Sequence, residues 1–385
     1  MKTNCMQLYL GVLGCIVLTG CTGGLVEGNP PEDARLVTVC FSKPTLGTPT
    51  VLTRAEETAV PSSTPLPEGT TLRIGAYFRG KVGEQTSPVS FSTTAPTFEA
   101  TYVVKPEGYL SLCEVDDTGK QIVGDTEEMV VRTGVYDFYA ISPARKRIKD
   151  SDGTYKIKDI PHKEDVMTSF VRGVRVSQSS REVTLNTFSR KCAQVVFNVA
   201  PSKENVLPFS RLYATRLKVS KISLSGAVLI IGEDTGILPT GGDTGNPGQV
   251  VFDVDEFEPV ESDTNHVGLN KTKGILLPKN TEPFDVEIEV QRDDEQATLK
   301  ATIDKSISFD EGKRYVFTLE VKNNESRLLM KVLDWNMISF ADTNVGAPDK
   351  PYPDPDINEG IGTSFTVAVW KEIIWSGNGE VGGGK

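Results

Sequence analysis

Short stretches in which apolar and polar residues alternate recur along most of this chain. Residues 37–41 alternate in this way, as do the stretches 71–78, 98–104 and 134–142. Because successive side chains of a β-strand point to opposite faces, this alternation is typical of strands with one buried face. Clusters of Gly, Pro, Asp and Asn lie between the stretches and predict turns. The first half is therefore predicted to be built from strands.

The second half of the chain repeats the pattern. A weak helical pattern at residues 164–172 is the one exception that we expect. Strands of this length separated by turn clusters favour an all-β fold of antiparallel β-sandwiches. We place a boundary near residue 190, which gives two tandem domains, 55–190 and 191–340. The strands predicted in the second domain are 193–199, 217–224, 250–254, 274–277, 284–290, 296–303, 315–321 and 328–332.

The chain begins with an apolar run, residues 6–18, that is too short to span a bilayer, which needs about 20 apolar residues. Its size fits a signal peptide. The run ends in Leu-Thr-Gly-Cys21, the pattern that bacterial lipoprotein processing recognises. Residues 1–20 are therefore predicted to be a lipoprotein signal peptide, with the lipid, palmitate included, on Cys21. An ordinary secretory signal with an incidental cysteine is the alternative. No later run is apolar for 18 residues, so we expect no transmembrane helix.

Charge and cysteine content narrow the function further. The net charge is −11, from 41 basic and 52 acidic residues, which argues against nucleic acid as a partner. Outside the first 21 residues the cysteines are Cys40, Cys113 and Cys192, an odd number. The last two have apolar neighbours and are expected to be free buried thiols. A disulfide between them stays open.

The residue types needed for catalysis or metal binding are scarce. His162 and His266 both lie in polar surroundings and are expected in surface loops, which leaves little for a catalytic triad. The stretch that begins at Asp354 resembles a calcium loop but has Glu359 where the loop needs glycine. Residues 145–147, Arg-Lys-Arg, are expected in an exposed turn. We expect no enzyme activity, no cofactor and no metal.

Two segments stand outside the predicted domains. Arg54 follows the short apolar strand 37–41 and precedes a linker rich in Pro, Ser and Thr at residues 60–69. Taken alone, Arg54 is a solvated loop residue. After residue 340 comes a polar linker, and residues 363–371 then alternate like a strand. This tail, residues 341–385, has no obvious partner in its own chain.

Several motifs, taken together, resemble the fimbrillin family, the subunits of type V pili on certain Gram-negative anaerobes. The motifs are the lipoprotein signal, Thr-Arg54-Ala55 with residues 66–77, the aromatic stretch 134–143, and the stretches 275–278, 309–319 and 332–335. The resemblance implies two transthyretin-like β-sandwiches in tandem. It also implies a precursor that is exported, lipidated and held at the outer membrane by the lipoprotein processing and export machinery.

The resemblance further implies how such a precursor matures. An arginine-specific protease cuts between Arg54 and Ala55, and the propeptide 21–54 leaves with its strand. A strand from another pilus subunit fills the gap, which gives a homo- or hetero-polymer at the cell surface, a fimbrium that supports adhesion. The leaving strand would carry Val37, Val39 and Phe41. The donor strand would carry Phe365, Val367 and Val369.

A second function, from a different class, is an outer-membrane lipoprotein that binds glycans. Trp370 and Trp375 could form an aromatic sugar platform, and an amphipathic donor strand explains them equally well. A glycan-binding protein would stay uncut. The position of the chain in a fibre (shaft, tip, accessory or anchor), its adhesion ligand and the role of its Gly-rich end stay open.

Overall fold

The structure is a computed structural model that describes residues 35–47, 63–124, 126–201, 212–240, 248–259, 270–278, 283–292, 295–303, 307–321, 326–334, 365–370 and 376–377. In these residues the chain consists of β-strands joined by turns and two short 3-10 helices, Pro106–Gly108 and Val254–Glu256. None of the helices described is long and apolar enough to cross a membrane. The predicted all-β fold class is confirmed.

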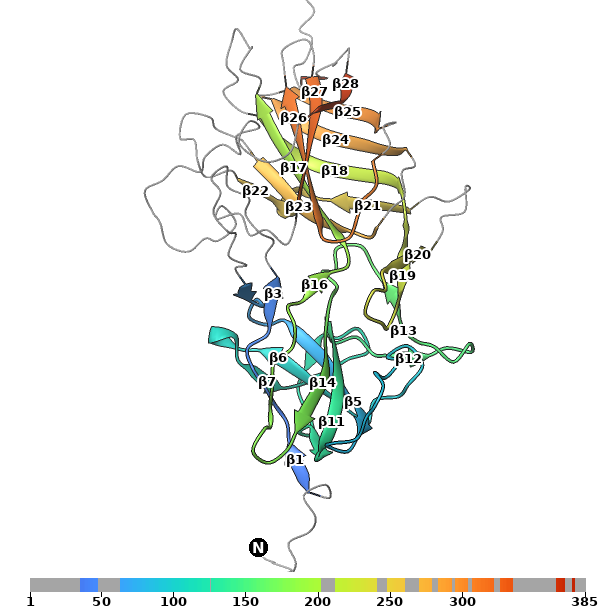
Figure 1. Ribbon diagram of the computed structural model, residues 1–385. Helices are drawn as coiled ribbons and strands as arrows, with labels where there is room; N and C mark the ends of the chain where they lie inside the picture. The colour runs from blue at the N-terminus through green and yellow to red at the C-terminus, as the bar shows by residue number, and fades with distance from the viewer. Residues whose placement is uncertain are drawn as a thin grey trace, which may run out of the picture.

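One six-stranded antiparallel sheet, the main sheet, forms the centre of the lower unit in Figure 1, in the order β16-β14-β11-β5-β6-β7. The strands expected at residues 71, 98 and 134 are confirmed. The weak helical pattern was wrong, because most of that stretch lies in β14, which pairs with β11 on both sides of a bulge. The strands are β5 (Thr71–Gly80), β6 (Phe98–Val104), β7 (Leu110–Leu112), β11 (Gly134–Ser142), β14 (Met167–Val176) and β16 (Ser189–Arg190).

The pairing of β11 with β14 is interrupted by a bulge at Asp137. The side chain of Asp137 is fully buried and accepts hydrogen bonds from the backbone N–H of Gly173 at 2.8 Å and of Val89 at 2.9 Å. Gly173 has a φ of 65°, a conformation that glycine adopts without strain. The carboxylate therefore supplies partners for backbone groups at the place where the ladder is broken.

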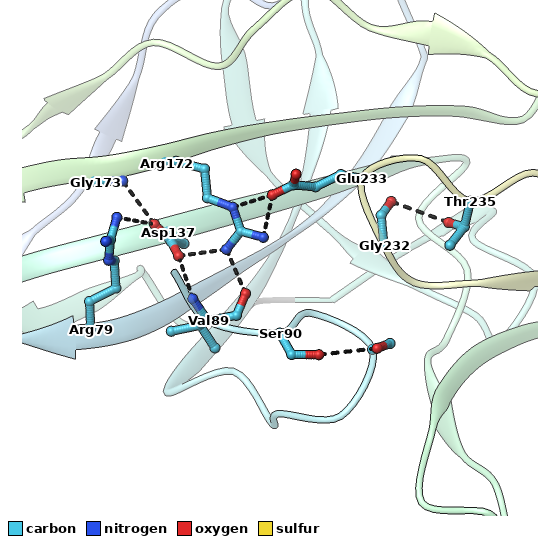
Figure 2. A network of polar contacts seen from close by, with 10 residues as sticks. Arg79, Val89, Ser90, Asp137, Arg172, Gly173, Gly232, Glu233 and Thr235 are labelled. Atoms are coloured by element: carbon cyan, nitrogen blue, oxygen red, sulfur yellow. Dashed lines mark hydrogen bonds and ion pairs between the residues drawn. The ribbon is translucent and has the colours of Figure 1, made fainter. Parts of the chain in front are cut away.

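Two arginines neutralise this buried carboxylate, as Figure 2 shows. Arg79 contacts Asp137 at 3.3 Å and Arg172 contacts it at 2.5 Å. Arg172 also lies 3.7 Å from the ring centroid of Phe91 and forms an ion pair with Glu233. Because Glu233 lies in the turn after β19, the network ties the main sheet to a hairpin from much later in the chain.

A second layer of short strands covers one face of the main sheet. Its pairs are β1 with β10, β2 with β15 and β3 with β4. The apolar side chains of both layers form one core cluster, which includes Leu72, Ile74 and Phe138 from the main sheet. The short strands, with the separate pair β8 and β9, are β1 (Leu36–Thr38), β2 (Cys40–Phe41), β3 (Thr45–Gly47), β4 (Ser63–Pro65), β8 (Glu114–Val115), β9 (Gln121–Ile122), β10 (Val130–Arg132) and β15 (Glu182–Val183).

A four-stranded sheet, in the order β12-β13-β19-β20, joins residues from both sides of residue 190. In Figure 1, β12 and β13 lie beside the lower unit, and β19 and β20 lie above them, towards the upper unit. The sheet shares a core cluster with the main sheet, which includes Tyr139 of β11, Ile157 and Leu229. Cys192 is a free buried thiol in this cluster, and Cys113 is also free and buried. The strands are β12 (Ile148–Lys149), β13 (Tyr155–Ile160), β19 (Leu224–Ile230) and β20 (Ile237–Thr240).

The loop after β13 contacts the second half of the chain through His162. The His162 Nε2–H donates to the Ser223 carbonyl oxygen at 2.8 Å, and Nδ1 accepts a hydrogen bond from the Leu277 N–H at 3.2 Å. Burial lowers the pKa of His162, against the weaker opposing effect of the bond to Ser223. His162 lies in a loop, as expected, but its ring is part-buried and bridges two halves of the molecule.

Residues 145–147 are also not an exposed turn. Arg145 is 6% exposed and forms a two-point ion pair with Glu164, at 2.5 and 2.7 Å. The Arg147 Nη1 donates to the Tyr77 hydroxyl at 2.6 Å, and Nη2 contacts Glu99 at 2.5 Å. Both guanidinium groups thus form ion pairs and hydrogen bonds within the fold.

The upper unit consists of two sheets that enclose one core, in the orders β22-β23-β17-β26-β27-β28 and β21-β18-β24-β25-β29. The strands predicted for the second half are confirmed. All pairs are antiparallel except β17 with β26. The strands are β17 (Ala193–Pro201), β18 (Leu212–Ile222), β21 (Gly248–Phe252), β22 (Phe257–Pro259), β23 (Asn270–Leu276), β24 (Phe284–Arg292), β25 (Glu295–Ile303), β26 (Lys313–Val321), β27 (Ser326–Asp334), β28 (Phe365–Trp370) and β29 (Ser376–Gly377).

Two close contacts fix the two sheets of the upper unit against each other. A Cβ on Gly274 would lie 2.1 Å from the ring of Phe252, so only glycine lets this ring pack against the backbone of β23. The Asn270 side chain accepts from the Ala214 N–H at 3.0 Å and donates to the Ala214 carbonyl oxygen at 2.7 Å. A buried polar side chain is therefore satisfied by the backbone of the facing sheet.

Candidate functional site

The N-terminal segment, residues 35–47, is an internal part of the covering layer. Its first strand pairs antiparallel with β10, and its second strand pairs in parallel with β15. The Val39 N–H donates to the Met129 carbonyl oxygen at 2.8 Å on one side. The N–H groups of Cys40 and Ser42 donate to the carbonyl oxygens of Arg181 and Val183, both at 3.0 Å, on the other. The segment thus bridges two strands that are not paired with each other.

The side chains of the segment alternate between the core and solvent. Val37 is 1% exposed and Val39 is 4% exposed, whereas Leu36 is 62% exposed and Cys40 points outward. Phe41 is half-buried and contacts aromatic rings of the main sheet edge-on. The three positions predicted from the sequence therefore lie together, facing the same core.

The buried part of the segment extends further than the sequence suggested. Pro44, Gly47 and Pro49 favour a loop over residues 42–50, but β3 lies within this stretch and Leu46 is 4% exposed. The Phe188 N–H donates to the Thr45 carbonyl oxygen at 2.7 Å, and the Leu66 N–H donates to the Pro44 carbonyl oxygen at 3.1 Å. Leu46 is the only aliphatic residue in the stretch 42–50, and this isolated apolar position between Pro44 and Pro49 was the available signal.

Between the two buried parts of the segment, Lys43 points outward and contacts an aromatic ring. Its Nζ lies 4.2 Å from the ring centroid of Tyr109, a cation–π contact. Tyr109 follows a tight turn in which Gly108 has a φ of 83°. A Cβ on Gly108 would approach Pro65 at 3.2 Å and Lys43 at 3.7 Å, so the turn lies close against the segment.

The surroundings of the segment suit a peptide strand better than a reaction. Burial raises the pKa of Tyr102, with a smaller effect from nearby Cys40, so this hydroxyl stays protonated at neutral pH. No group of three or more His, Cys, Asp or Glu residues that could hold a metal ion occurs in the part of the chain that the structure describes. What the site offers is an apolar surface bordered by backbone hydrogen-bonding groups. We call this surface, contributed by β10, β15, β4 and the main sheet, the segment site.

The predicted donor strand lies far from the segment site. Phe365, Val367 and Val369 belong to β28, which pairs antiparallel with β27 at the edge of a sheet in the upper unit. The expectation that the tail lacks a partner in its own chain was therefore wrong for these residues. Figure 1 places β1 and β28 at opposite ends of the molecule. The leaving strand and the donor strand predicted from the sequence are thus far apart within one molecule.

The remaining predicted positions fall outside the described residues. These are Cys21, Arg54, Ala55 and Trp375. The described residues that flank the expected cut are Gly47 and Ser63, which pair with each other across β3 and β4.

Several solved structures are similar to this chain, and the first of those described here shares its fold. A candidate cell adhesion protein from Bacteroides fragilis is 17% identical, with 78% of this chain and 98% of that chain covered and a TM-score of 0.51. One from Bacteroides uniformis is 16% identical and covers 76% and 98%, with a TM-score of 0.45. The C-terminally truncated tip fimbrial protein Mfa3 from Porphyromonas gingivalis is 9% identical and covers 70% and 95%, with a TM-score of 0.34.

A family comparison identifies the chain where pairwise identity is too low to do so. No curated protein sequence matches it. The family model described as fimbrillin-like matches residues 89–335, which is more than half of the chain. The matched region contains most of the main sheet and nearly all of the upper unit, and it confirms the resemblance found in the sequence motifs. The chain therefore belongs to the fimbrillin-like family.

Proposed function

We propose that this protein is a structural subunit of a cell-surface pilus, made as a precursor whose N-terminal segment is cut off and replaced by a strand from another subunit. The observation that carries the proposal is the position of the segment between β10 and β15, with Val37, Val39 and Leu46 in the core. A segment at the start of the chain that fills an internal strand position can leave without any other strand having to move through the fold.

Loss of the segment would leave an unstable protein. Each buried Val or Leu contributes about 1.5–3 kcal/mol by burial, so the three side chains together contribute about 5–9 kcal/mol. The backbone groups of Met129, Arg181 and Val183 would also lose their partners. Because whole domains are stable by about 5–15 kcal/mol, the vacated site would strongly favour a replacement strand.

The tail supplies a strand of suitable character. The segment 365–370 carries Phe365, Val367 and Val369 at alternate positions, as the leaving segment carries apolar residues at alternate positions. The tail and the segment site lie at opposite ends of the molecule, which favours donation to a neighbouring subunit in a head-to-tail chain.

The rest of the proposal follows the maturation route of such precursors. Cys21 carries the lipid, palmitate included, that holds the exported precursor at the outer membrane, and an arginine-specific protease cuts between Arg54 and Ala55. The mature subunit comprises domains 55–190 and 191–340 and the tail 341–385, and it becomes part of an adhesive fimbrium. Its role is structural and not catalytic.

The proposal is tested by brief trypsin digestion of purified residues 21–385, read by intact mass and by gel electrophoresis without boiling. We expect loss of a fragment that ends at Arg54 and a ladder of oligomers formed by the remaining chain. The matched control is Arg54→Gln, which should give neither. A segment that stays uncut in the wild type would contradict the proposal and favour a tethered glycan-binding protein.

A further inference from the structure

We propose that Tyr109 is a specificity-determining residue of the segment site. Its ring binds a lysine of the incoming strand and so fixes the direction and register of that strand. The incoming strand is the tail of a second copy of this chain, with Lys371 over the Tyr109 ring. This inference rests on the proposed function, because it describes how the vacated site chooses its replacement strand.

The present occupant of the site shows what a fitting strand must supply. Val37 and Val39 fill the first part of the site and Leu46 fills the last part. Between them, Lys43 lies with its Nζ 4.2 Å from the Tyr109 ring centroid. A lysine at this one position is therefore the polar feature that distinguishes a fitting strand from any other alternating strand.

The tail repeats this order with constant spacing. Each matched tail residue lies 328 positions after its counterpart in the segment. A shift of one residue would turn the apolar side chains of the tail away from the core, so the spacing defines a register and not merely a resemblance. The matched positions are Val37 with Phe365, Val39 with Val367, Phe41 with Val369, Lys43 with Lys371 and Leu46 with Ile374.

The opposite direction fits only half of the site. A reversed tail would place Val369, Val367 and Phe365 at the first three core positions, an equally good match there. The same reversal would place Thr363 at the lysine position and Gly360 at the Leu46 position. The contact with Tyr109 and the Leu46 position therefore select the direction that the leaving segment has.

One buried position of the register differs in character. Pro44 is buried, and its counterpart in the tail is Glu372. A charged side chain is unfavourable at a buried position that offers no partner. The substitution Glu372→Pro should therefore slow the dissociation of the assembled subunits, and faster dissociation would contradict the proposed register.

Disulfide trapping tests the register directly. Glu182 lies opposite Cys40 in the parallel pair of β2 and β15. The register places Ala368 at the position of Cys40, whereas the reversed direction places Thr366 there. In Glu182→Cys protein, we expect Ala368→Cys to give disulfide-linked oligomers after the cut and Thr366→Cys to give few.

The uncut Glu182→Cys precursor is the positive control, because strand neighbours about 4.8 Å apart are close enough for a disulfide with native Cys40. The reverse result, links through Thr366→Cys and not Ala368→Cys, would overturn the inference while leaving strand exchange intact. A chain that forms no ladder after the cut would remove the proposed function and this inference with it.

Variants of the aromatic contact test the role of Tyr109. Tyr109→Leu removes the ring, and we expect the assembled subunits to dissociate about two- to fivefold faster, the range for an exposed cation–π contact. Tyr109→Phe keeps the ring face and should behave as wild type. Lys371→Met should reproduce the loss, and Lys371→Arg should restore slow dissociation. Equal dissociation rates for Tyr109→Leu and Tyr109→Phe would contradict the role of Tyr109.

Discussion

The N-terminal segment and the C-terminal strand β28 occupy very different positions. The segment lies between β10 and β15 and places its apolar side chains in a core shared with the main sheet. β28 lies at the end of its sheet and pairs with β27 alone in the strand order. Removing the segment opens a gap inside a layer, whereas removing β28 exposes one more edge. The tail is thus the strand whose departure costs a folded subunit less, whereas an empty segment site leaves a gap that a replacement strand would fill.

Deleting β28 first, and then the segment as well, tests this difference with the largest expected effect. Residues 21–362, which lack β28, should fold with a stability close to that of the full precursor. Residues 55–362, which lack both, should lose at least about 5 kcal/mol and unfold or aggregate. Chemical denaturation followed by circular dichroism measures both. Equal stabilities for the two shortened chains would remove the basis for strand replacement.

The bulge at Asp137 provides the next test. Asp137→Asn removes the negative charge that faces Arg79 and Arg172, of which Arg172 keeps its ion pair with Glu233, and breaking a buried pair costs about 3–5 kcal/mol. The exposed pair of Asp117 and Lys146 supplies the control, since Asp117→Asn should change stability by less than about 1 kcal/mol. Thermal melts compare the two variants. Similar melting temperatures would show that the network around Asp137 does not stabilise the main sheet.

Within the segment, the two faces should respond differently. Leu46→Ala removes a side chain that is 4% exposed and should destabilise the precursor by about 2–5 kcal/mol. Leu36→Ala acts on a side chain that is 62% exposed and should have almost no effect. Denaturant unfolding of the two precursors measures the difference. A small effect at Leu46 would limit the segment site to its first part.

The smallest effect that we expect is a dependence of stability on pH, and it comes from His162, whose ring bridges the two halves of the molecule. Because burial lowers the pKa of folded His162, its contribution is fully present above about pH 6.5, the ordinary pKa of histidine. It should decrease as the pH falls from there towards the lower pKa of the folded state. His162→Gln should abolish this step, and His266→Gln should retain it, in melts recorded across the range. The rate of the Arg54 cut should not change, because His162 lies away from the segment.

The sequence predicted the strands well and the contacts between distant parts poorly. The alternation of apolar and polar residues predicted the strands because each strand has one face towards a core. This pattern depends only on neighbouring residues in the sequence. The burial of His162 and Arg145 escaped prediction because their partners, Ser223 and Glu164, come together only in the folded chain. The second part of the segment was missed for a related reason. β3 is short, and its partner β4 lies in a Pro-rich stretch that resembles a linker.

Of the candidate site, Val37, Val39 and Phe41 were predictable because they alternate without interruption. Lys43 gave no signal in the sequence, since an exposed lysine near a proline is ordinary. Its contact with Tyr109 depends on the turn at Gly108, which only the folded structure brings against the segment.

Hydrogen exchange at the edges of the segment site tests the central claim most directly. The backbone N–H groups of Leu66, Thr133 and Phe188 all donate to carbonyl oxygens of the segment. We predict that they are protected in the precursor, exchange rapidly once the segment has been cut and removed, and become protected again in the oligomers. Protection that survives removal of the segment, or that does not return on assembly, would contradict the account.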